Sequence, residues 1–301
     1  MKNLFAGTGV ALITPFHKYG TIDFTSLEKV VRHVIDGKVD YLVVLGTTGE
    51  SPTISKDEKN ALLDFVIETT NNKIPIVKGI GGNNTQEIID TITSKSHEGI
   101  SGILSVCPYY NKPQQKGLYQ HYKAIACASS LPIILYNVPG RTGCNIEAET
   151  TLELAHEFNN IVAIKEASGN FNQVSRILKN KPKDFIVISG DDQLTVPMMA
   201  IGASGVISVT ANAFPAEFSK MVDLCSQGKF EEASTIHYEL LDIMDAFFED
   251  GSPAGIKAAM QILNLSQNHL RLPVIRVNKS LYMKLNNLIT EYQESKIKKV
   301  K

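Results

Sequence analysis

The stretch IVAIKEASGN, residues 161–170, places a lysine directly after four apolar residues and ahead of a polar turn. A short apolar run that ends in small polar residues is typical of a strand buried in a parallel sheet. An ammonium group buried without a partner costs several kcal/mol. Lys165 is therefore expected to have a partner, to lie at the mouth of a wet cavity, or to take part in chemistry.

Seven further runs of this kind recur along the chain, and segments with helical periodicity such as LEKVVRHVI (27–35) and EKNALLDFVIETT (58–70) separate them. Eight strand–helix units in one chain favour a closed (β/α)8 TIM barrel, and an open doubly wound sheet is the alternative. The seven runs are GVALITPF (9–16), YLVVLGTTGE (41–50), IPIVKGIGG (74–82), GILSVCPYY (102–110), LPIILYNVPGRT (131–142), DFIVISGDD (184–192) and GVISVTAN (205–212).

The sequence also indicates where two helices begin and where the barrel ends. Residues 25–28 and 55–58 have the spacing of capping boxes, with Ser or Thr three residues before Glu. From about residue 214 onward the pattern is purely helical. We therefore expect a barrel domain over residues 1–227 and a C-terminal helical extension over residues 228–301.

Composition narrows the class of protein. The 301 residues carry 30 Lys and Arg against 31 Asp and Glu, a formal net charge of -1, so neither nucleic acid nor a membrane surface is an expected partner. Four cysteines without a Cys-x-x-Cys pattern, and histidines without metal-ligand spacing, predict a reduced, cytoplasmic protein without a metal. Asp191 and Asp192 could suggest a metal, but their place ahead of a helix favours capping.

In a barrel the carboxyl ends of the strands form the active face, and Lys165 would lie at that end of the sixth strand. Burial there favours the neutral amine, a nucleophile suited to a Schiff base with a carbonyl substrate. The alternative is a structural ion pair, with Glu166 as the nearest candidate. Lys78 occupies a similar place on the third strand, and spacing alone does not decide which lysine faces the barrel axis.

Other strand ends carry groups that suit a small anionic substrate. GTTGES, residues 46–51, offers hydroxyl and backbone donors for a carboxylate or phosphate, although an ordinary loop would look the same. Tyr136 could relay a proton and Arg141 could bind a carboxylate. Each is also compatible with a structural role, as a packed tyrosine or a solvated surface charge.

The ordered set GTTGES, CPYYNKP, LYNVPGRTG, IVAIKEASGN, SGDD and GVISVTAN resembles the dihydrodipicolinate synthase branch of the pyruvate-dependent class I aldolases. The likeness extends over residues 7–271. It implies a TIM barrel in which Lys165, rather than Lys78, forms a covalent imine with pyruvate, with no cofactor and no metal.

The resemblance also implies a role for each matching residue. Thr47 and Thr48 would hold the carboxylate of pyruvate, and Arg141 would hold that of L-aspartate 4-semialdehyde. Tyr136 would shuttle protons through Thr47, and Tyr110 from a neighbouring subunit of a homotetramer would complete the relay. Gly190 and Ile207 would line the bound pyruvate. The implied product is 4-hydroxy-tetrahydrodipicolinate, on the route to diaminopimelate and lysine.

Some positions depart from the family pattern. Lys78 and Ile80 replace smaller or hydroxylated residues, which predicts an extra charge at the floor of the site. The positions matching the lysine-inhibition site of sensitive members are Ser51, Asn83, Glu87 and Tyr109. Lys56 and Lys59 nearby would repel the ammonium of lysine, so inhibition is expected to be weak or absent.

Two other functions remain open at this stage. A sister aldolase, such as an N-acetylneuraminate lyase or a keto-deoxy sugar acid aldolase, would share the lysine and the tyrosine. A non-catalytic ligand-binding barrel would form no covalent adduct.

Overall fold

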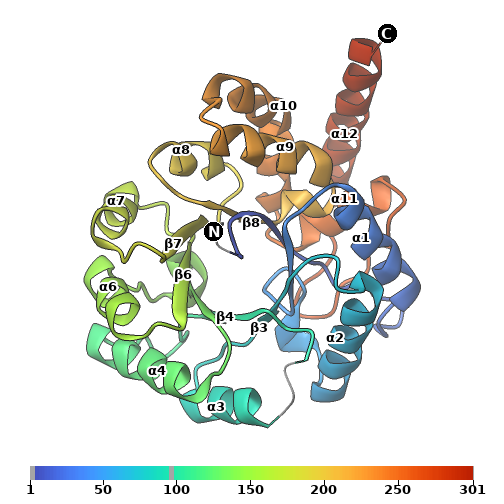
Figure 1. Ribbon diagram of the computed structural model, residues 1–301. Helices are drawn as coiled ribbons and strands as arrows, with labels where there is room; N and C mark the ends of the chain where they lie inside the picture. Colours follow the sequence, from blue (N-terminus) through green and yellow to red (C-terminus); the bar gives the residue numbers. More distant parts are fainter. Residues whose placement is uncertain (1–3, 95–97, 301) are drawn as a thin grey trace.

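The structure is a computed structural model that describes residues 4–94 and 98–300. Eight parallel strands close into a barrel, each paired with the next and β8 paired with β1 (Figure 1). The closed barrel is confirmed and the open sheet is excluded. The strands are β1 (Gly7–Ala11), β2 (Tyr41–Val44), β3 (Ile76–Gly79), β4 (Gly102–Val106), β5 (Ile133–Asn137), β6 (Ile161–Glu166), β7 (Ile186–Ser189) and β8 (Gly205–Ser208).

Helices surround the barrel and then continue beyond it (Figure 1). The first group is α1 (Phe24–Asp36), α2 (Lys56–Thr70), α3 (Thr85–Thr93), α4 (Gln115–Ala128), α5 (Pro139–Thr142), α6 (Ala148–Glu157), α7 (Phe171–Asn180), α8 (Thr195–Ala200) and α9 (Pro215–Ser226). The extension contains α10 (Phe230–Phe248), α11 (Ala254–Ile262) and α12 (Lys279–Val300), and two short 3-10 helices are η1 (Ser51–Thr53) and η2 (Thr210–Asn212).

Strand side chains alternate between two cores, as the pleat requires. An inner core fills the barrel and includes Val77, Leu104, Ile134 and Ile188. An outer core between strands and helices takes their neighbours, such as Ile76. Runs that are apolar at every position are therefore explained by burial of both faces.

The barrel closes where β8 meets β1, and a glycine makes that closure possible. Gly205 has φ +154° and pairs with Gly7, and a Cβ atom at Gly205 would overlap the backbone of Gly7. Only glycine tolerates both the positive φ and the close approach. The register between the first and last strands thus depends on this pair.

One of the two predicted capping boxes is correct. The Ser55 side chain accepts from the Glu58 N–H, and the Glu58 side chain accepts from the Ser55 N–H, so α2 begins as expected. The prediction for residues 25–28 is wrong, because α1 begins earlier and Asp23 is its cap, accepting from the N–H and hydroxyl of Ser26. The aspartate prevails because its carboxylate is a strong acceptor for a helix N-terminus.

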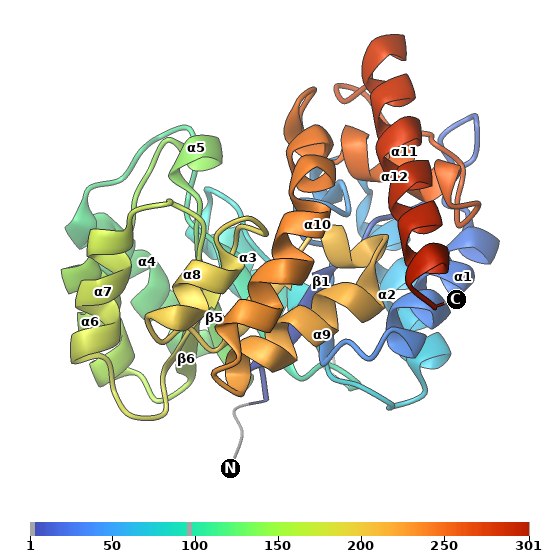
Figure 2. The ribbon, with the colours of Figure 1, turned by 90° about the horizontal axis from the view of Figure 1, so that it is seen from above.

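The extension packs against the barrel and shares its outer core. Leu240, Met260 and Leu285 belong to the same hydrophobic cluster as the barrel helices. Figure 2 shows α10 and α12 running side by side on one side of the barrel. The division between residues 227 and 228 stays a prediction, because a shared core does not by itself separate folding units.

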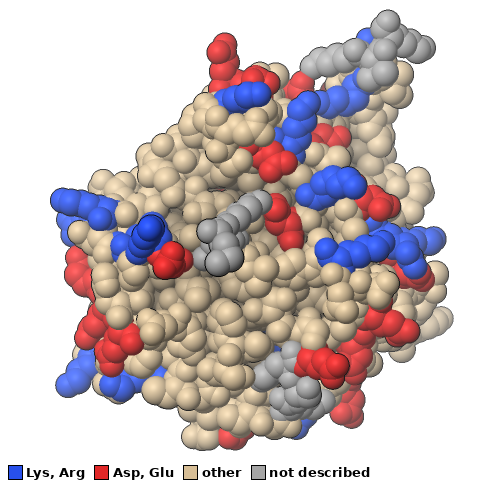
Figure 3. Space-filling view, viewed as in Figure 1, with Lys and Arg blue, Asp and Glu red and all other residues tan. Residues whose placement is uncertain are grey.

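The described residues include no helix long and apolar enough to cross a membrane. On the face drawn in Figure 3, basic and acidic side chains are interspersed around the rim. On that face, within the described part of the chain, no patch of a single sign stands out that would attract a polyanion.

Candidate active site

A cavity of about 370 Å³ opens at the carboxyl ends of the strands. This is the end of a barrel at which loops and strand termini assemble active sites. It is lined by Ala11, Val43, Gly46, Thr47, Thr48, Leu104, Tyr136, Val138, Arg141, Lys165, Ala167, Gly190, Asp191, Gln193, Val209, Asp245, Phe248 and Ser252. Lys165, Tyr136, Thr47, Thr48, Arg141 and Gly190, all selected from the sequence, thus meet in one cavity.

Lys165 and Tyr136 lie side by side in this cavity. They are register partners on β6 and β5, and the Lys165 Nζ lies 4.4 Å from the centre of the Tyr136 ring. Both side chains are buried, with 5% and 6% of their surface exposed. Among the described residues, the Lys165 ammonium has no hydrogen-bonding or ion-pair partner, so the amine is available to an incoming carbonyl.

The pleat of the strands shows which of Lys78 and Lys165 faces the barrel axis. Val77 belongs to the inner core and Ile76 to the outer one, so Lys78 points outward between strand and helices. Ile80 likewise belongs to the outer core. The predicted extra charge at the floor of the site is therefore wrong.

Glu166 does not pair with Lys165, contrary to the structural alternative considered for that lysine. The pleat turns Glu166 outward, where its carboxylate accepts from the Asn137 side chain at 3.1 Å, the Gln173 side chain at 2.9 Å and the Ser168 N–H at 2.8 Å. These neutral donors stabilise a buried carboxylate without a cation. They also tie the ends of β5 and β6 together behind the cavity.

Gly190 leaves the space that the Lys165 side chain occupies. A Cβ atom at this position would lie 2.7 Å from the Ala167 Cβ and 3.0 Å from the Lys165 Cε. The Gly190 N–H also donates to the Glu166 carbonyl at 2.8 Å, which extends the pairing of β7 with β6. Any larger residue would push against the lysine that the cavity presents.

The GTTGE loop after β2, residues 46–50, is a tight turn that opens one wall of the cavity. Leu45, just before the loop, and Glu50, its last residue, both have positive φ (64° and 55°) although neither is glycine. The Glu50 N–H donates to the Thr47 carbonyl at 3.1 Å, and the Thr14 hydroxyl donates to the Gly49 carbonyl at 2.7 Å. These bonds fix the backbone of the loop from which the threonine side chains extend.

The rim of the cavity contains residues that the sequence did not single out. Asp245 and Phe248 from α10, with Ser252 from the loop after it, lie in the lining together with Arg141 of α5. The Gln193 side chain donates to Asp245 and so links the loop after β7 to α10. Nothing in a helical hydrophobic pattern indicates which polar residue of an extension reaches the barrel mouth.

The two aspartates of SGDD do not cap the helix that follows them. Asp192 accepts from the N–H groups of Val209 and Thr210, at 3.1 and 2.7 Å, and from the Thr210 hydroxyl at 2.6 Å. It therefore anchors the loop after β8, and α8 begins at Thr195 with no side-chain cap. Burial raises the pKa of Asp192, against the lowering effect of the bonds from Thr210. The described residues contain no cluster of three side chains able to hold a metal ion.

Comparison with known proteins identifies the family of this chain. The model of the Dihydrodipicolinate synthetase family matches residues 4–292. The chain belongs to this family. It is 50% identical to the 4-hydroxy-tetrahydrodipicolinate synthase of Flavobacterium psychrophilum over 282 residues, which are 94% of this chain and 96% of the relative.

Solved structures of family members share the fold closely. The dihydrodipicolinate synthase of Acinetobacter baumannii, solved in complex with pyruvate, has 37% identity and a TM-score of 0.93 over 96% of this chain and 99% of that one. The enzyme from Cyanidioschyzon merolae, solved with lysine bound, has 38% identity and a TM-score of 0.93 over 97% and 99%.

The remaining residues selected from this family resemblance lie outside the cavity lining. Tyr110 is 86% exposed and has φ +74°. Ile207 packs in the inner core. At the positions of the family's lysine site, the Asn83 side chain donates to the Tyr109 carbonyl at 3.3 Å. Ser51 begins η1, and Glu87 lies exposed in the first turn of α3.

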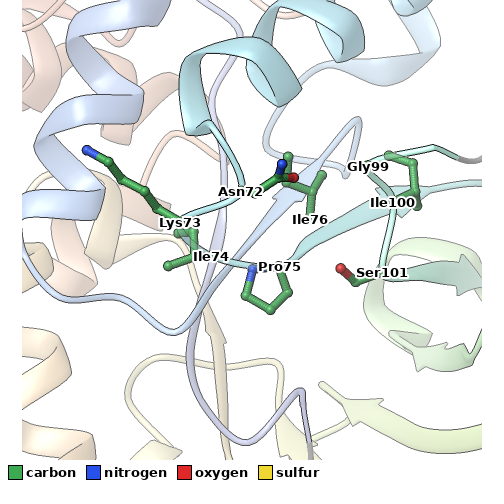
Figure 4. Close-up of a pocket in the computed structure, with 8 residues that line it drawn as sticks. All are labelled: Asn72, Lys73, Ile74, Pro75, Ile76, Gly99, Ile100 and Ser101. Atoms are coloured by element: carbon green, nitrogen blue, oxygen red, sulfur yellow. The ribbon is translucent and has the colours of Figure 1, made fainter.

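A second cavity of about 320 Å³ lies at the opposite end of the barrel, beside the amino ends of β3 and β4. It is lined by residues 72–76 and 99–101 (Figure 4). Figure 4 shows the Lys73 side chain directed away from Pro75 and Ser101. No reactive groups of the described residues converge on this second cavity. The cavity that contains Lys165 is therefore the better candidate for chemistry.

Proposed function

We propose that this member of the family condenses pyruvate with L-aspartate 4-semialdehyde to give 4-hydroxy-tetrahydrodipicolinate, the first committed step toward diaminopimelate and lysine. The observation that carries the proposal is the buried Lys165 amine, without a partner among the described residues, beside Tyr136 in an open cavity. The similarity to 4-hydroxy-tetrahydrodipicolinate synthases over nearly the full length supports the choice of substrates.

In the proposed mechanism the carboxylate of pyruvate binds the Thr47 and Thr48 side of the cavity. The Lys165 amine attacks the ketone carbon, and loss of water leaves a protonated imine. This cation withdraws electrons from the adjacent methyl group, which loses a proton and becomes the nucleophilic carbon of an enamine. Tyr136, beside the lysine, would carry the protons through Thr47.

The second substrate would then enter from the rim. Arg141 on α5 lines the cavity and can bind the substrate carboxylate through two parallel N–H···O bonds. The enamine carbon attacks the aldehyde, and the amine of the bound aspartate semialdehyde displaces Lys165 from the imine, closing a ring and regenerating the free lysine. A sister aldolase that binds a polyhydroxylated aldehyde, without a second carboxylate, would have less use for the Arg141 guanidinium at the rim.

We also propose a homotetramer in which Tyr110 reaches the site of a neighbouring subunit. Its exposure of 86% and its positive φ support this, because a large aromatic side chain held in a strained backbone and exposed to water is typical of a residue buried by a partner. The four free cysteines fit a cytoplasmic enzyme.

The test is intact-mass measurement after incubation with pyruvate and borohydride. The wild type is expected to gain one reduced pyruvyl group, Lys165→Ala to gain none, and Lys78→Ala to behave as the wild type because that side chain points outward. In a coupled assay with aspartate semialdehyde, Lys165→Ala should lose at least about 10⁴-fold in activity. A wild type that is folded and forms no adduct would contradict the proposed function.

A further inference from the structure

A buried ionic cluster joins the C-terminal extension to the loop after β2. Lys257 of α11 has no exposed surface and donates to the carboxylate of Glu50, which is 3% exposed. The Lys257 ammonium also donates to the His269 carbonyl at 2.8 Å and lies 4.2 Å from the centre of the Phe16 ring. Burial lowers the pKa of Lys257 to about 8, although the Glu50 carboxylate acts to raise it.

Arg271 completes the cluster from the segment between α11 and α12. Its backbone N–H donates to the second oxygen of Glu50 at 3.0 Å, so both carboxylate oxygens are engaged. Its guanidinium donates to the Thr53 carbonyl at 2.7 Å, to the Gly20 carbonyl and to the carboxylate of Glu58. The extension thereby holds both ends of the segment from Glu50 to the first turn of α2.

Glu50 has an unfavourable backbone conformation for its residue type. Its φ of 55° is in the left-handed region, which costs a residue other than glycine, asparagine or aspartate about 1 kcal/mol or more. Such strain persists only where the surroundings hold the residue in place. Besides its local backbone bonds, the contacts that hold Glu50 are made by its side chain with residues more than 200 positions away.

The strained residue is also the last residue of the GTTGE loop. Its N–H donates to the Thr47 carbonyl at 3.1 Å, and its carbonyl accepts from the Thr53 N–H at 2.9 Å. A shift of Glu50 would therefore move the backbone of Thr47, which lines the cavity.

We propose that Glu50 and Lys257 are positioning residues that set the affinity of the site for the carboxylate of a small keto acid, by fixing the threonines of the GTTGE loop. The inference rests on the proposed function, because it takes pyruvate as the ligand of Thr47 and Thr48. It assigns the extension a part in substrate binding that goes beyond covering the barrel.

The test is the pyruvate concentration that gives half-maximal borohydride-trapped adduct, measured on folded protein. Lys257→Met is expected to raise this concentration about tenfold or more, because Glu50 loses its cation. Glu50→Gln, which keeps oxygen and shape but removes the charge, is expected to raise it about threefold or more. The matched control is Lys284→Met, which removes an exposed ion pair of the same extension with Glu249 and should stay within twofold of the wild type.

Half-saturation does not depend on how much of the sample is active, so simple loss of folded protein would leave it unchanged. In turnover, the KM for pyruvate should rise with it while the KM for aspartate semialdehyde stays within twofold, since Arg141 lies on α5. If Lys257→Met does not fold, Glu50→Gln decides alone. Unchanged half-saturation in the folded variants would overturn the inference and leave the proposed function standing, whereas a wild type without adduct would overturn both.

Discussion

Lys165 and Lys257 are both buried, and the regions around them are opposites. Lys165 lies at the end of β6, beside an aromatic ring and an open cavity, and has no anionic partner among the described residues. Lys257 lies between α11 and the loop after β2, with a carboxylate, a backbone carbonyl and an aromatic ring around it. Both residues are buried, Lys165 with 5% and Lys257 with none of its surface exposed.

The difference shows how the same residue type, lysine, can be suited to catalysis in one region and to structural support in another. A cation that is already paired in a closed space cannot approach a substrate, and its removal leaves an uncompensated charge. A cation beside a cavity without a partner is costly to bury, and its removal relieves that cost. Burial alone therefore does not identify a catalytic lysine, whereas burial with a cavity and no partner does.

The largest expected effect separates the two regions by stability. Lys257→Met should lower the free energy of unfolding by about 3–5 kcal/mol, because Glu50 is left as an unpaired buried charge. Lys165→Met should leave it unchanged or raise it, since an unpaired ammonium is replaced by an apolar side chain of similar length. Equilibrium unfolding in urea, at one fixed protein concentration, measures both.

The double variant Glu50→Gln/Lys257→Met provides the control, because it removes both charges and should recover most of the loss. If Lys165→Met were the more damaging of the two single variants, the comparison of the two regions would be wrong.

A smaller effect is expected from crowding the reactive lysine. Gly190→Ala would place a methyl group 3.0 Å from the Lys165 Cε, so the side chain must shift or the strands must separate. We expect a loss of about 1–3 kcal/mol in stability and at least tenfold slower adduct formation. Gly140→Ala on α5 is the matched control, since a Cβ there meets nothing within 4 Å. Equal rates in both variants would show that Lys165 is not confined by Gly190.

The smallest effect concerns the outer edge of the cluster around Lys257. The bond from Arg271 holds the pKa of Glu58 down at about 2, below its ordinary value of 4.5. A carboxyl group with a depressed pKa contributes stability that is fully present above the ordinary value and is lost as pH falls toward 2. Glu58→Gln should therefore reduce stability at neutral pH by about 1–2 kcal/mol, since the side chain is 32% exposed and partly screened.

The same variant should also flatten the pH dependence of unfolding between pH 4.5 and 2, which thermal unfolding across that range can measure. A slope equal to that of the wild type would mean that other carboxylates dominate acid unfolding.

The sequence predicted the barrel because its signal is local and repeated. Each strand is a short apolar run that ends in turn residues, as in residues 161–170, and eight such runs leave few topologies. The cavity residues were also identifiable, because the strand ends of a barrel converge. Lys165 and Tyr136 lie at the ends of β6 and β5, and Thr47 and Arg141 follow within a few residues of β2 and β5. The inward orientation of Lys165 rather than Lys78 required the family resemblance or the observed pleat.

What the sequence did not predict depends on long-range partners. Lys257 is one charged residue in an amphipathic helical pattern, and nothing near it in sequence indicates a carboxylate 207 residues away. The cap of α1 was misjudged because Asp23 and Thr25 are both suitable capping residues, and only the structure shows that the helix begins at Phe24, between them. Asp192 was assigned to its own helix although its partners belong to the next strand's loop.

The separation of 207 residues between Glu50 and Lys257 also has a consequence for biosynthesis. The GTTGE loop leaves the ribosome early, but its anchor is synthesised only when most of the chain is complete, and Arg271 follows later still. A nascent chain can pair its first strands long before the wall of its substrate site is fastened. If this anchor positions the threonines as proposed, the substrate site is complete only after residues 257 and 271 have been synthesised.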